Sequence, residues 1–373
     1  MDLIYLWPGL SNEAPQKVGK NIIKYIANRK GDVKFNLKIL HNEKKLNRDL
    51  PKNLDVITYN EFKNLKTRSI IHEPITPSIP LLSGWDKLRI YWLSSQKKIP
   101  IISNYHGDFY TEFVWWIKNR EFFKIAINIR RFPFEPFLFR MNHIVIVHSP
   151  IMKDLLERRH RLAKIMIIPN GIGEWWFNTK VPQIELDGKP SIFYHGRLSY
   201  EKGLMHLIEA FSKIKKKTKS RAKLYLAGSG SLEKKLRDMC KKLGIESDVI
   251  FIGKLNQEKI KMYLQSCDAA IYPSLFESFP LSYLEALSSA KGPCYFSNKG
   301  SQGILYFASD EEKKILNLFE PTKAGIYEVF SRIIRCSERN NLKQKKFAKK
   351  FLWEKVINYY IKLYNEIYDE LNY

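Results

Sequence analysis

Cysteine is scarce in this sequence, and metal-binding motifs are missing. Only four cysteines occur in 373 residues, widely spaced and without a CxxC pair. Each lies in or beside an apolar run, which predicts reduced core thiols of a cytoplasmic protein. No Asp-x-Asp occurs and the eight histidines show no ligand spacing, so we expect no metal cofactor. The cysteines are Cys240, Cys267, Cys294 and Cys336.

Long hydrophobic runs are missing as well. No apolar segment approaches the ~20 residues that a membrane-spanning helix needs. The chain does not open with a basic segment followed by an apolar one, as a secretion signal would. These two absences predict a cytoplasmic protein that is at most held at a membrane surface.

Acidic residues are too few to balance the basic ones. The sequence has 63 Lys and Arg against 38 Asp and Glu, which gives a formal net charge of +25. This excess favours anionic partners: nucleotide phosphates, nucleic acid or an acidic membrane face. Much of it lies on polar helix faces, such as Lys213 to Lys219 and Lys343 to Lys350, which is typical of solvated surface.

What the sequence does contain is a regular alternation of strand-like apolar runs and amphipathic helical segments. This alternation predicts an α/β fold with parallel sheets and helices on both faces. A segment rich in turn-forming residues, Gly171 to Lys189, separates two such series. We therefore expect two Rossmann-like domains with a cleft between them, one at 1–172 and one at 187–350.

The expected elements can be placed on the sequence. Strands of the first series are predicted at Leu3 to Trp7, Phe35 to Leu40, Val56 to Tyr59, Ser69 to His72, Ile99 to Tyr105, Ile144 to His148 and Ile165 to Pro169. Helices are predicted near Gln16 to Asn28, Trp85 to Gln96 and Ile151 to Arg161. Strands of the second series are predicted at Ile192 to His195, Lys223 to Ala227, Val249 to Gly253 and Ala269 to Tyr272.

The stretch from Ala269 to Ala290 has the pattern of a buried strand, a loop and a helix. We expect Ser278 to cap this helix and Pro280 to occupy its first turn. Glu277 then lies in the loop and Glu285 in the second helical turn. Ligands of open parallel sheets bind outside the carboxyl ends of the strands, so both carboxylates are expected to face a ligand. Taken alone, such a pair is more often a solvated loop residue and a favourable charge near a helix start than a ligand site.

A second strand end carries cations. The strand that runs to His195 and Gly196 is followed by Arg197 and Lys202, and then by a helix near Leu204 to Lys216. Two full cations beside the unpaired N–H groups of a helix start predict an anion site.

The first domain gives weaker signals. The turn after its first strand has a single glycine, Gly9, which falls well short of GxGxxG. His106 follows another strand and is expected at the inter-domain cleft. A histidine in such a place is more often a hydrogen-bonded structural residue.

Together these segments resemble the signature of glycosyltransferase family 4. Glu277, Phe279, Leu281 and Leu284-Glu285-Ala286 match the two glutamates that flank a Phe and a Leu before Leu-Glu-Ala. Gly196-Arg197-Leu198 with Lys202-Gly203 is similar to the element that holds the donor diphosphate. Further matches, in order, are Pro169-Asn170-Gly171, Ala227-Gly228-Ser229-Gly230, Phe251-Ile252-Gly253 and the helix that Phe351-Leu352-Trp353-Glu354 begins.

The resemblance implies a GT-B fold and transfer of a hexosyl group from a nucleotide diphosphate sugar to an acceptor hydroxyl, with retention. The last helix, 353–373, would cross back to the first domain. Arg197 and Lys202 would stabilise the departing β-phosphate, and Glu277 would fix the sugar hydroxyls. His106 would lie near the transferred sugar, and Glu285 would accept both ribose hydroxyls. The other donor-binding residues that it implies are Gly9, Asn170, Gly196, Gly228, Gly253, Lys254, Ser278, Phe279 and Leu281.

The chain departs from the family pattern in places. Pro280 stands where the family has a Gly whose N–H could face the donor, so one hydrogen bond is lost. Lys299 to Gly303 replaces a Gly-Gly-x-x-Glu segment, which removes a carboxylate. The identity of the donor sugar therefore stays open, and an inactive member of the family is an alternative.

Aromatic rings and cations alternate between Phe109 and Met141, as in Trp115, Trp116 and Arg120. Such a segment suits an anionic membrane surface, where rings lie among the headgroups. It suits ordinary inter-helix core with cations reaching solvent equally well. If it meets membrane, the acceptor is expected to be lipid-linked; a growing glycan is the other hypothesis.

Two other classes of function compete with the enzyme. A GT-B protein could bind nucleotide sugars without turnover, and the net charge of +25 suits a nucleic-acid-binding protein. Nucleic acid is not expected as a partner, because recognised binding motifs are missing and the basic residues form no single stripe. A sugar phosphorylase or an epimerase of the same fold is a further enzymatic alternative.

Overall fold

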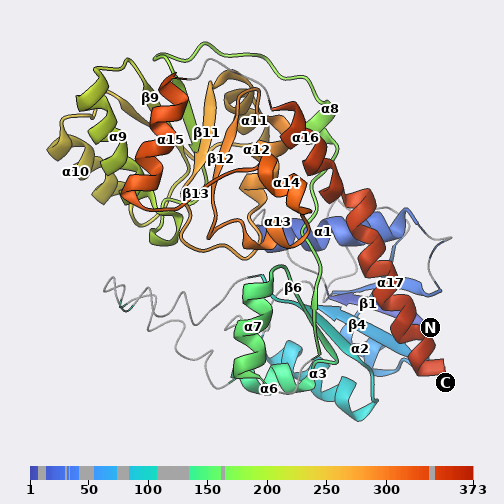
Figure 1. Cartoon of the computed structure of the whole chain (residues 1–373). Helices are drawn as coiled ribbons and strands as arrows, with labels where there is room; N and C mark the ends of the chain where they lie inside the picture. Colours follow the sequence, from blue (N-terminus) through green and yellow to red (C-terminus); the bar gives the residue numbers. More distant parts are fainter. Residues whose placement is uncertain are drawn as a thin grey trace. The chain divides into compact units, whose positions relative to one another are not determined.

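The computed structural model describes residues 1–6, 14–29, 32, 34–41, 54–73, 84–106, 117, 122, 134–160, 164–335 and 341–372. It divides the chain into two compact units, Met1–Gly171 with Trp353–Tyr373, and Ile172–Leu352. Figure 1 shows the elements of both units along the chain.

The first unit contains a parallel sheet. Seven of its strands lie within the described residues, in the order β3-β2-β1-β4-β5-β6-β7, and every pairing is parallel. In chain order the strands are β1 Asp2–Leu6, β2 Asn36–Leu40, β3 Asp55–Ile57, β4 Ser69–Glu73, β5 Ile101–Asn104, β6 Ile144–Val147 and β7 Lys164–Ile167. The strands are short and mostly apolar, as expected for a parallel sheet that is covered on both faces.

Helices connect these strands. They are α1 Ala14–Ala27, α2 Tyr59–Lys63, α3 Gly84–Gln96, α6 Phe134–Met141 and α7 Pro150–Arg159, together with the C-terminal helix α17, Trp353–Asn372. Helix α17 packs beside α1, as Figure 1 shows. The ring of Trp353, the first residue of α17, packs so closely on Gly171 that a Cβ there would lie 2.4 Å from it.

A buried polar network also joins α17 to the sheet of its own unit. His72 on β4 shares hydrogen bonds with the Tyr364 hydroxyl and, at 2.7 Å, with Asn104 Oδ1. Asn104 in turn donates to the Tyr360 hydroxyl at 3.0 Å. Burial lowers the pKa of His72 to about 3, so its ring is neutral and the network carries no buried charge.

The second unit has the classical strand order of a dinucleotide-binding fold. Within the described residues its six-stranded parallel sheet runs β10-β9-β8-β11-β12-β13. The strands are β8 Ser191–His195, β9 Lys223–Ala227, β10 Val249–Gly253, β11 Ala269–Tyr272, β12 Cys294–Ser297 and β13 Asn317–Phe319. The order reverses between β8 and β11, and ligands of such sheets bind outside the strand ends at that point.

Helices cover both faces of this second sheet (Figure 1). Helices α9, α10 and α15 pack together on one side, and α8, α11, α12 and α16 on the other. The helices of this unit are α8 Trp175–Asn178, η3 Tyr200–Lys202, α9 Leu204–Thr218, α10 Glu233–Leu243, α11 Gln257–Ser266, α12 Leu281–Ser289, α13 Gln302–Tyr306, α14 Asp310–Ile315, α15 Lys323–Arg335, α16 Leu342–Ala348 and η4 Lys349–Phe351.

The predicted fold class is confirmed: both units are parallel sheets with flanking helices. Cys240, Cys267 and Cys294 are buried free thiols, as predicted, whereas Cys336 lies outside the described residues. Within the described part of the chain, no helix combines the length and the apolar character needed to cross a membrane.

Candidate active site

Two loops meet at the carboxyl ends of β8 and β11. The loop after β8 turns into α9 at Gly203, whose φ is +67°. A Cβ at Gly203 would lie 2.1 Å from the Pro273 carbonyl oxygen, so only glycine allows this approach. The Leu275 N–H donates to the Glu201 carbonyl at 2.7 Å and ties the second loop to the first. The cation-bearing and carboxylate-bearing loops are therefore in direct contact.

The centre of this contact is an ion pair. Lys202 Nζ lies 2.5 Å from Glu277 Oε1, and only 12% and 11% of the two side chains are exposed. The Ser274 hydroxyl donates to the same carboxylate oxygen at 2.8 Å. A carboxylate this sheltered from water needs such donors, because an unpaired buried charge is strongly destabilising.

Arg197, on the same loop as Lys202, is in a different environment. Its guanidinium is 3.2 Å from Glu201 Oε1, and 67% of the side chain is exposed. The backbone below it is fixed, because the buried Tyr194 hydroxyl donates to the Arg197 carbonyl at 3.0 Å. Glu201 also accepts from the Ser199 hydroxyl. Arg197 therefore combines a fixed backbone with a side chain that reaches water.

Glu285 lies in the second turn of α12, as predicted. Its Oε2 is 2.8 Å from Nε2 of His195, the last residue of β8. The other ring nitrogen of His195, Nδ1, is 2.8 Å from the Tyr272 hydroxyl at the end of β11. Both predicted carboxylates are thus anchored to the β8 end, one through Lys202 and the other through His195.

Glycines bring three strand ends together. A Cβ at Gly228 would lie 1.9 Å from the Gly196 carbonyl oxygen, and one at Gly230 would lie 2.3 Å from the Leu198 carbonyl oxygen. The Gly228 N–H donates to the Gly253 carbonyl at 2.8 Å. Gly228 and Gly230 must be glycine because neighbouring backbone occupies the space of a side chain. Lys254 follows the last of these strands and is exposed.

The start of α12 differs from the prediction in its cap. Pro280 is the N-cap residue and offers no side-chain hydrogen bond, so the prediction of Ser278 as the cap was wrong. Pro280 is extended, with φ −76° and ψ 118°, which places Ser278 two residues before the cap, too early to meet the helix N–H groups. The Ser278 hydroxyl is buried and has no hydrogen-bond partner within the described residues.

Phe279 and Leu281 occupy different surroundings. Phe279 is 5% exposed and packs with ring centroids 5.5 Å from Phe351 and 6.3 Å from Phe307. Leu281 is the first residue of α12 and is partly exposed. The Phe279 side chain therefore supports the loop from the core.

In the first unit, His106 lies after β5 beside a second histidine. His148 Nδ1 is 2.7 Å from the Ile168 carbonyl, and its Nε2 is 3.0 Å from His106 Nδ1. Burial lowers the pKa of His148 to about 4, so the ring is neutral and its Nδ1–H donates to the carbonyl. His148 Nε2 must then accept from the His106 Nδ1–H, which fixes the ring of His106. Asn170 is buried beyond β7, and Gly9 lies outside the described residues.

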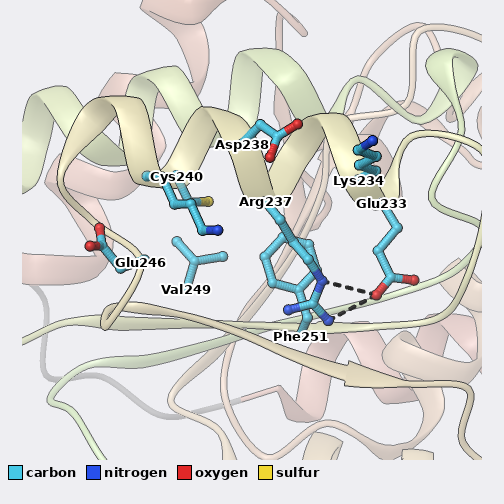
Figure 2. A pocket seen from close by; sticks show the side chains of 9 residues that line it. Glu233, Lys234, Arg237, Asp238, Cys240, Glu246, Val249 and Phe251 are labelled. Atoms are coloured by element: carbon cyan, nitrogen blue, oxygen red, sulfur yellow. Dashed lines mark hydrogen bonds and ion pairs between the residues drawn. The ribbon is translucent and has the colours of Figure 1, made fainter.

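A separate groove of about 570 Å³ lies between α10 and β10. Figure 2 shows Arg237 paired with Glu233, one turn away on the same helix. The guanidinium of Arg237 lies over the ring of Phe251, 4.3 Å from its centroid. None of the predicted site residues lines this groove. Within the described residues, no cluster of three or more His, Cys, Asp or Glu side chains is arranged to hold a metal ion.

Comparison with known families assigns the chain. The profile described as Glycosyl transferases group 1 matches residues 177–350, and that described as Glycosyltransferase Family 4 matches residues 70–173. The chain belongs to the GT-B glycosyltransferases of the family 4 type. The match therefore includes parts of both units, with residues 1–69 and 351–373 outside it.

Several known proteins are similar to the chain in sequence. An uncharacterized glycosyltransferase of Methanocaldococcus jannaschii is 35% identical over 136 residues, which are 34% of each chain. The alpha-monoglucosyldiacylglycerol synthase of Streptococcus pneumoniae is 29% identical over 261 residues, 65% of this chain and 56% of the relative. The chain thus spans about a third to somewhat over half the length of these relatives.

A solved structure shares the fold over nearly the whole chain. HepE of Anabaena, solved in complex with UDP and glucose, matches with a TM-score of 0.67 at 15% identity. The match covers 98% of this chain and 100% of HepE. At that identity the likeness establishes the GT-B fold and nothing finer.

Several residues around the site were not predicted. His195, Tyr272, Ser274 and Glu201 hold the functional side chains in place. His195 stands directly before the Gly-Arg-Leu motif, and that position was the one available signal. Its partners are 77 and 90 residues away in the chain, which no local pattern reveals.

Proposed function

We propose that this protein transfers a sugar, a hexose, from a nucleotide diphosphate sugar to an acceptor hydroxyl with retention of the anomeric configuration. One observation carries the proposal: Lys202 and Glu277 form a sheltered ion pair where the strand order reverses, and Arg197 lies on the same loop as Lys202, paired with Glu201. On these two touching loops the cations suit the diphosphate of a nucleotide sugar, and the carboxylates suit the hydroxyls of its sugar and ribose.

The cations would act on the leaving group. As the bond between the anomeric carbon and the β-phosphate oxygen breaks, negative charge grows on that phosphate. The ammonium group of Lys202 is largely sheltered from water, so it would stabilise the negative charge of that phosphate more strongly than a fully hydrated cation would. Arg197, with 67% of its side chain exposed, can swing onto an incoming diphosphate while its backbone stays fixed by Tyr194. Lys202 would exchange part of its contact with Glu277 for the phosphate.

The carboxylates would act on hydroxyl groups. In this proposal Glu277 accepts from the donor sugar hydroxyls next to the reacting carbon, and Glu285 accepts from the ribose diol. Ionised carboxylates are acceptors only, with two oxygens each, and therefore suit vicinal diols. The buried Ser278 hydroxyl, which has no partner in the described part of the chain, would gain one from the donor.

The transfer needs no protein base. The acceptor oxygen would form its bond to the anomeric carbon on the face that the diphosphate leaves. The electron pair of the broken bond goes to the phosphate oxygen, which takes the proton of the acceptor hydroxyl. The charge on that oxygen makes it the base, and Lys202 and Arg197 limit the charge it must carry. We propose no metal cofactor. That His106 lies near the transferred sugar remains a prediction.

A lipid-linked acceptor at an anionic membrane surface extends this proposal. Two apolar side chains of the aromatic and basic stretch are well exposed, Ile117 at 52% and Phe122 at 71%. Exposed apolar side chains among cations suit the headgroup layer of a membrane. The name of one relative, alpha-monoglucosyldiacylglycerol synthase, is that of an enzyme that makes a glycolipid.

A donor screen tests the proposed function. Thermal unfolding is measured with UDP, GDP and their common sugar conjugates, and each stabilising conjugate is then assayed for release of nucleoside diphosphate. A ligand present at 100 times its Kd should stabilise the fold by about 2.7 kcal/mol. Stabilisation with slow release of diphosphate supports the transferase. Stabilisation without any release, with acceptors present, would identify a binding protein, and no stabilisation at all would refute the proposal.

A further inference from the structure

Three side chains form a continuous hydrogen-bonded chain beneath the proposed ribose site. Tyr272, at the end of β11, is fully buried, and His195, at the end of β8, is 4% exposed. The Tyr272 hydroxyl is 2.8 Å from His195 Nδ1, and His195 Nε2 is 2.8 Å from Glu285 Oε2. The last member reaches the surface, since 17% of the Glu285 side chain is exposed.

The protons in this chain can be assigned. Burial raises the pKa of the Tyr272 hydroxyl well above its usual value, so it stays protonated. Its hydroxyl makes one hydrogen bond within the described residues, to His195 Nδ1, so a buried proton is satisfied only if Tyr272 donates there. His195 is then the neutral tautomer with its proton on Nε2, which donates to Glu285.

The ring of His195 is also held against rotation. It stacks at 5.6 Å on Phe193 and meets Tyr272 edge to face at 5.4 Å. A donor fixed in this way points at one carboxylate oxygen of Glu285, Oε2. The carboxylate therefore cannot rotate freely, and Oε1 has a set direction before any ligand binds.

We propose that His195 is a positioning residue, acting through Glu285, that makes the nucleotide site selective for ribonucleotides over 2′-deoxyribonucleotides. The proposal rests on the proposed function, in which Glu285 receives the ribose diol. A carboxylate with one oxygen fixed by His195 presents the remaining lone pairs in one geometry, matched to two adjacent hydroxyls. Loss of the 2′-hydroxyl then leaves an acceptor unpaired in a partly buried site, which a freely turning carboxylate would avoid.

The experiment compares Kd values for UDP with dUDP and for GDP with dGDP by titration calorimetry, in the full-length protein. The wild type should bind one of the ribonucleotides about tenfold or more tightly than its deoxy form. His195→Leu should weaken ribonucleotide binding about tenfold (~1.4 kcal/mol) and reduce the preference to about twofold. His195→Gln, whose amide nitrogen can occupy the place of Nε2, should recover most of the preference.

Tyr272→Phe provides a second route if His195→Leu folds poorly. It keeps the ring but removes the donor to His195 Nδ1 and leaves the tautomer of His195 unfixed, so the ribose preference should fall about threefold. A purely structural role would lower the unfolding temperature and leave the ratio of Kd values unchanged, which would overturn the proposal. If Glu285→Ala abolishes the ribose preference while His195→Leu and Tyr272→Phe retain it, only the proposed role of the Tyr272–His195–Glu285 relay is refuted. If the wild type binds no nucleotide, both the relay and the proposed function fail.

Discussion

Removal of the Lys202 cation should separate its role in stability from its role in transfer. In Lys202→Met the Glu277 carboxylate, 11% exposed, keeps only the Ser274 hydroxyl as a donor within the described residues. Breaking a buried ion pair costs ~3–5 kcal/mol, and partial access to water places this pair at about 3 kcal/mol. For a unit of this size that corresponds to a fall of ~6–12 °C in unfolding temperature.

Adding Glu277→Gln to Lys202→Met should restore part of the lost stability but not the lost transfer activity. Glu277→Gln together with Lys202→Met leaves no unpaired charge, so the double variant should be more stable than Lys202→Met by at least about 1 kcal/mol. Transfer should not recover. Loss of one donor that stabilises developing charge typically costs ~10²–10³ in rate, and the double variant also lacks the carboxylate proposed to hold the sugar.

Thermal unfolding and release of nucleoside diphosphate measure the two effects. Lys216→Met, on the exposed face of α9, is the matched control, because it removes one cation and should change stability by less than about 0.5 kcal/mol. Equal losses in Lys202→Met and Lys216→Met would refute the argument. So would a double variant that regains turnover, because the proposed site would then act without its cation.

Three other predictions follow from single features. Gly228→Ala should lower the free energy of unfolding in urea by at least about 2 kcal/mol, since its Cβ would lie 1.9 Å from the Gly196 carbonyl oxygen. The control is Gly244→Ala, which is also at positive φ but has no atom within 4 Å of the added Cβ, and it should lower that free energy less. Equal losses in the two variants would contradict the steric explanation. Burial lowers the pKa of Lys261 from 10.5 to about 8, so below pH 8 its charge destabilises the folded state, and this penalty disappears as the pH rises towards 10.5. In urea titrations the free energy of unfolding of the wild type should therefore rise relative to that of Lys261→Met between pH 8 and pH 10.5. A difference that does not change with pH would contradict this. Phe122→Ser with Ile117→Ser should reduce co-sedimentation with anionic liposomes several-fold, whereas Tyr306→Ser, at a comparably exposed ring, should not; unchanged binding would remove the membrane hypothesis.

Much of the fold could be predicted because buried parallel strands are uninterrupted apolar runs. Every strand predicted from such a run is present, and its ends lie within two residues of the predicted ones. Examples are Lys223–Ala227 and Ala269–Tyr272. The strands Cys294–Ser297 and Asn317–Phe319 were not predicted. Runs of three or four residues carry too little pattern, and they become strands by pairing onto β11 and β12.

For the candidate site, the sequence indicated where the charged side chains lie but not the residues that hold them in place. Charged residues in turns at strand ends can be found from local sequence, which located Lys202, Glu277 and Glu285 before any contact was known. The cap at Ser278 was wrong because an extended Pro280 delays the helix start by two residues, a matter of backbone angles. His195 was missed because its role depends on contacts with Tyr272 and Glu285, distant in the sequence.

A crystal structure with a bound nucleoside diphosphate, UDP or GDP, tests the central claim most directly. The account predicts the diphosphate in contact with Lys202 and Arg197, and the ribose hydroxyls within hydrogen-bond distance of Glu285. A nucleotide bound in the groove between α10 and β10, or at any place away from the loops that carry Lys202 and Glu277, would contradict it.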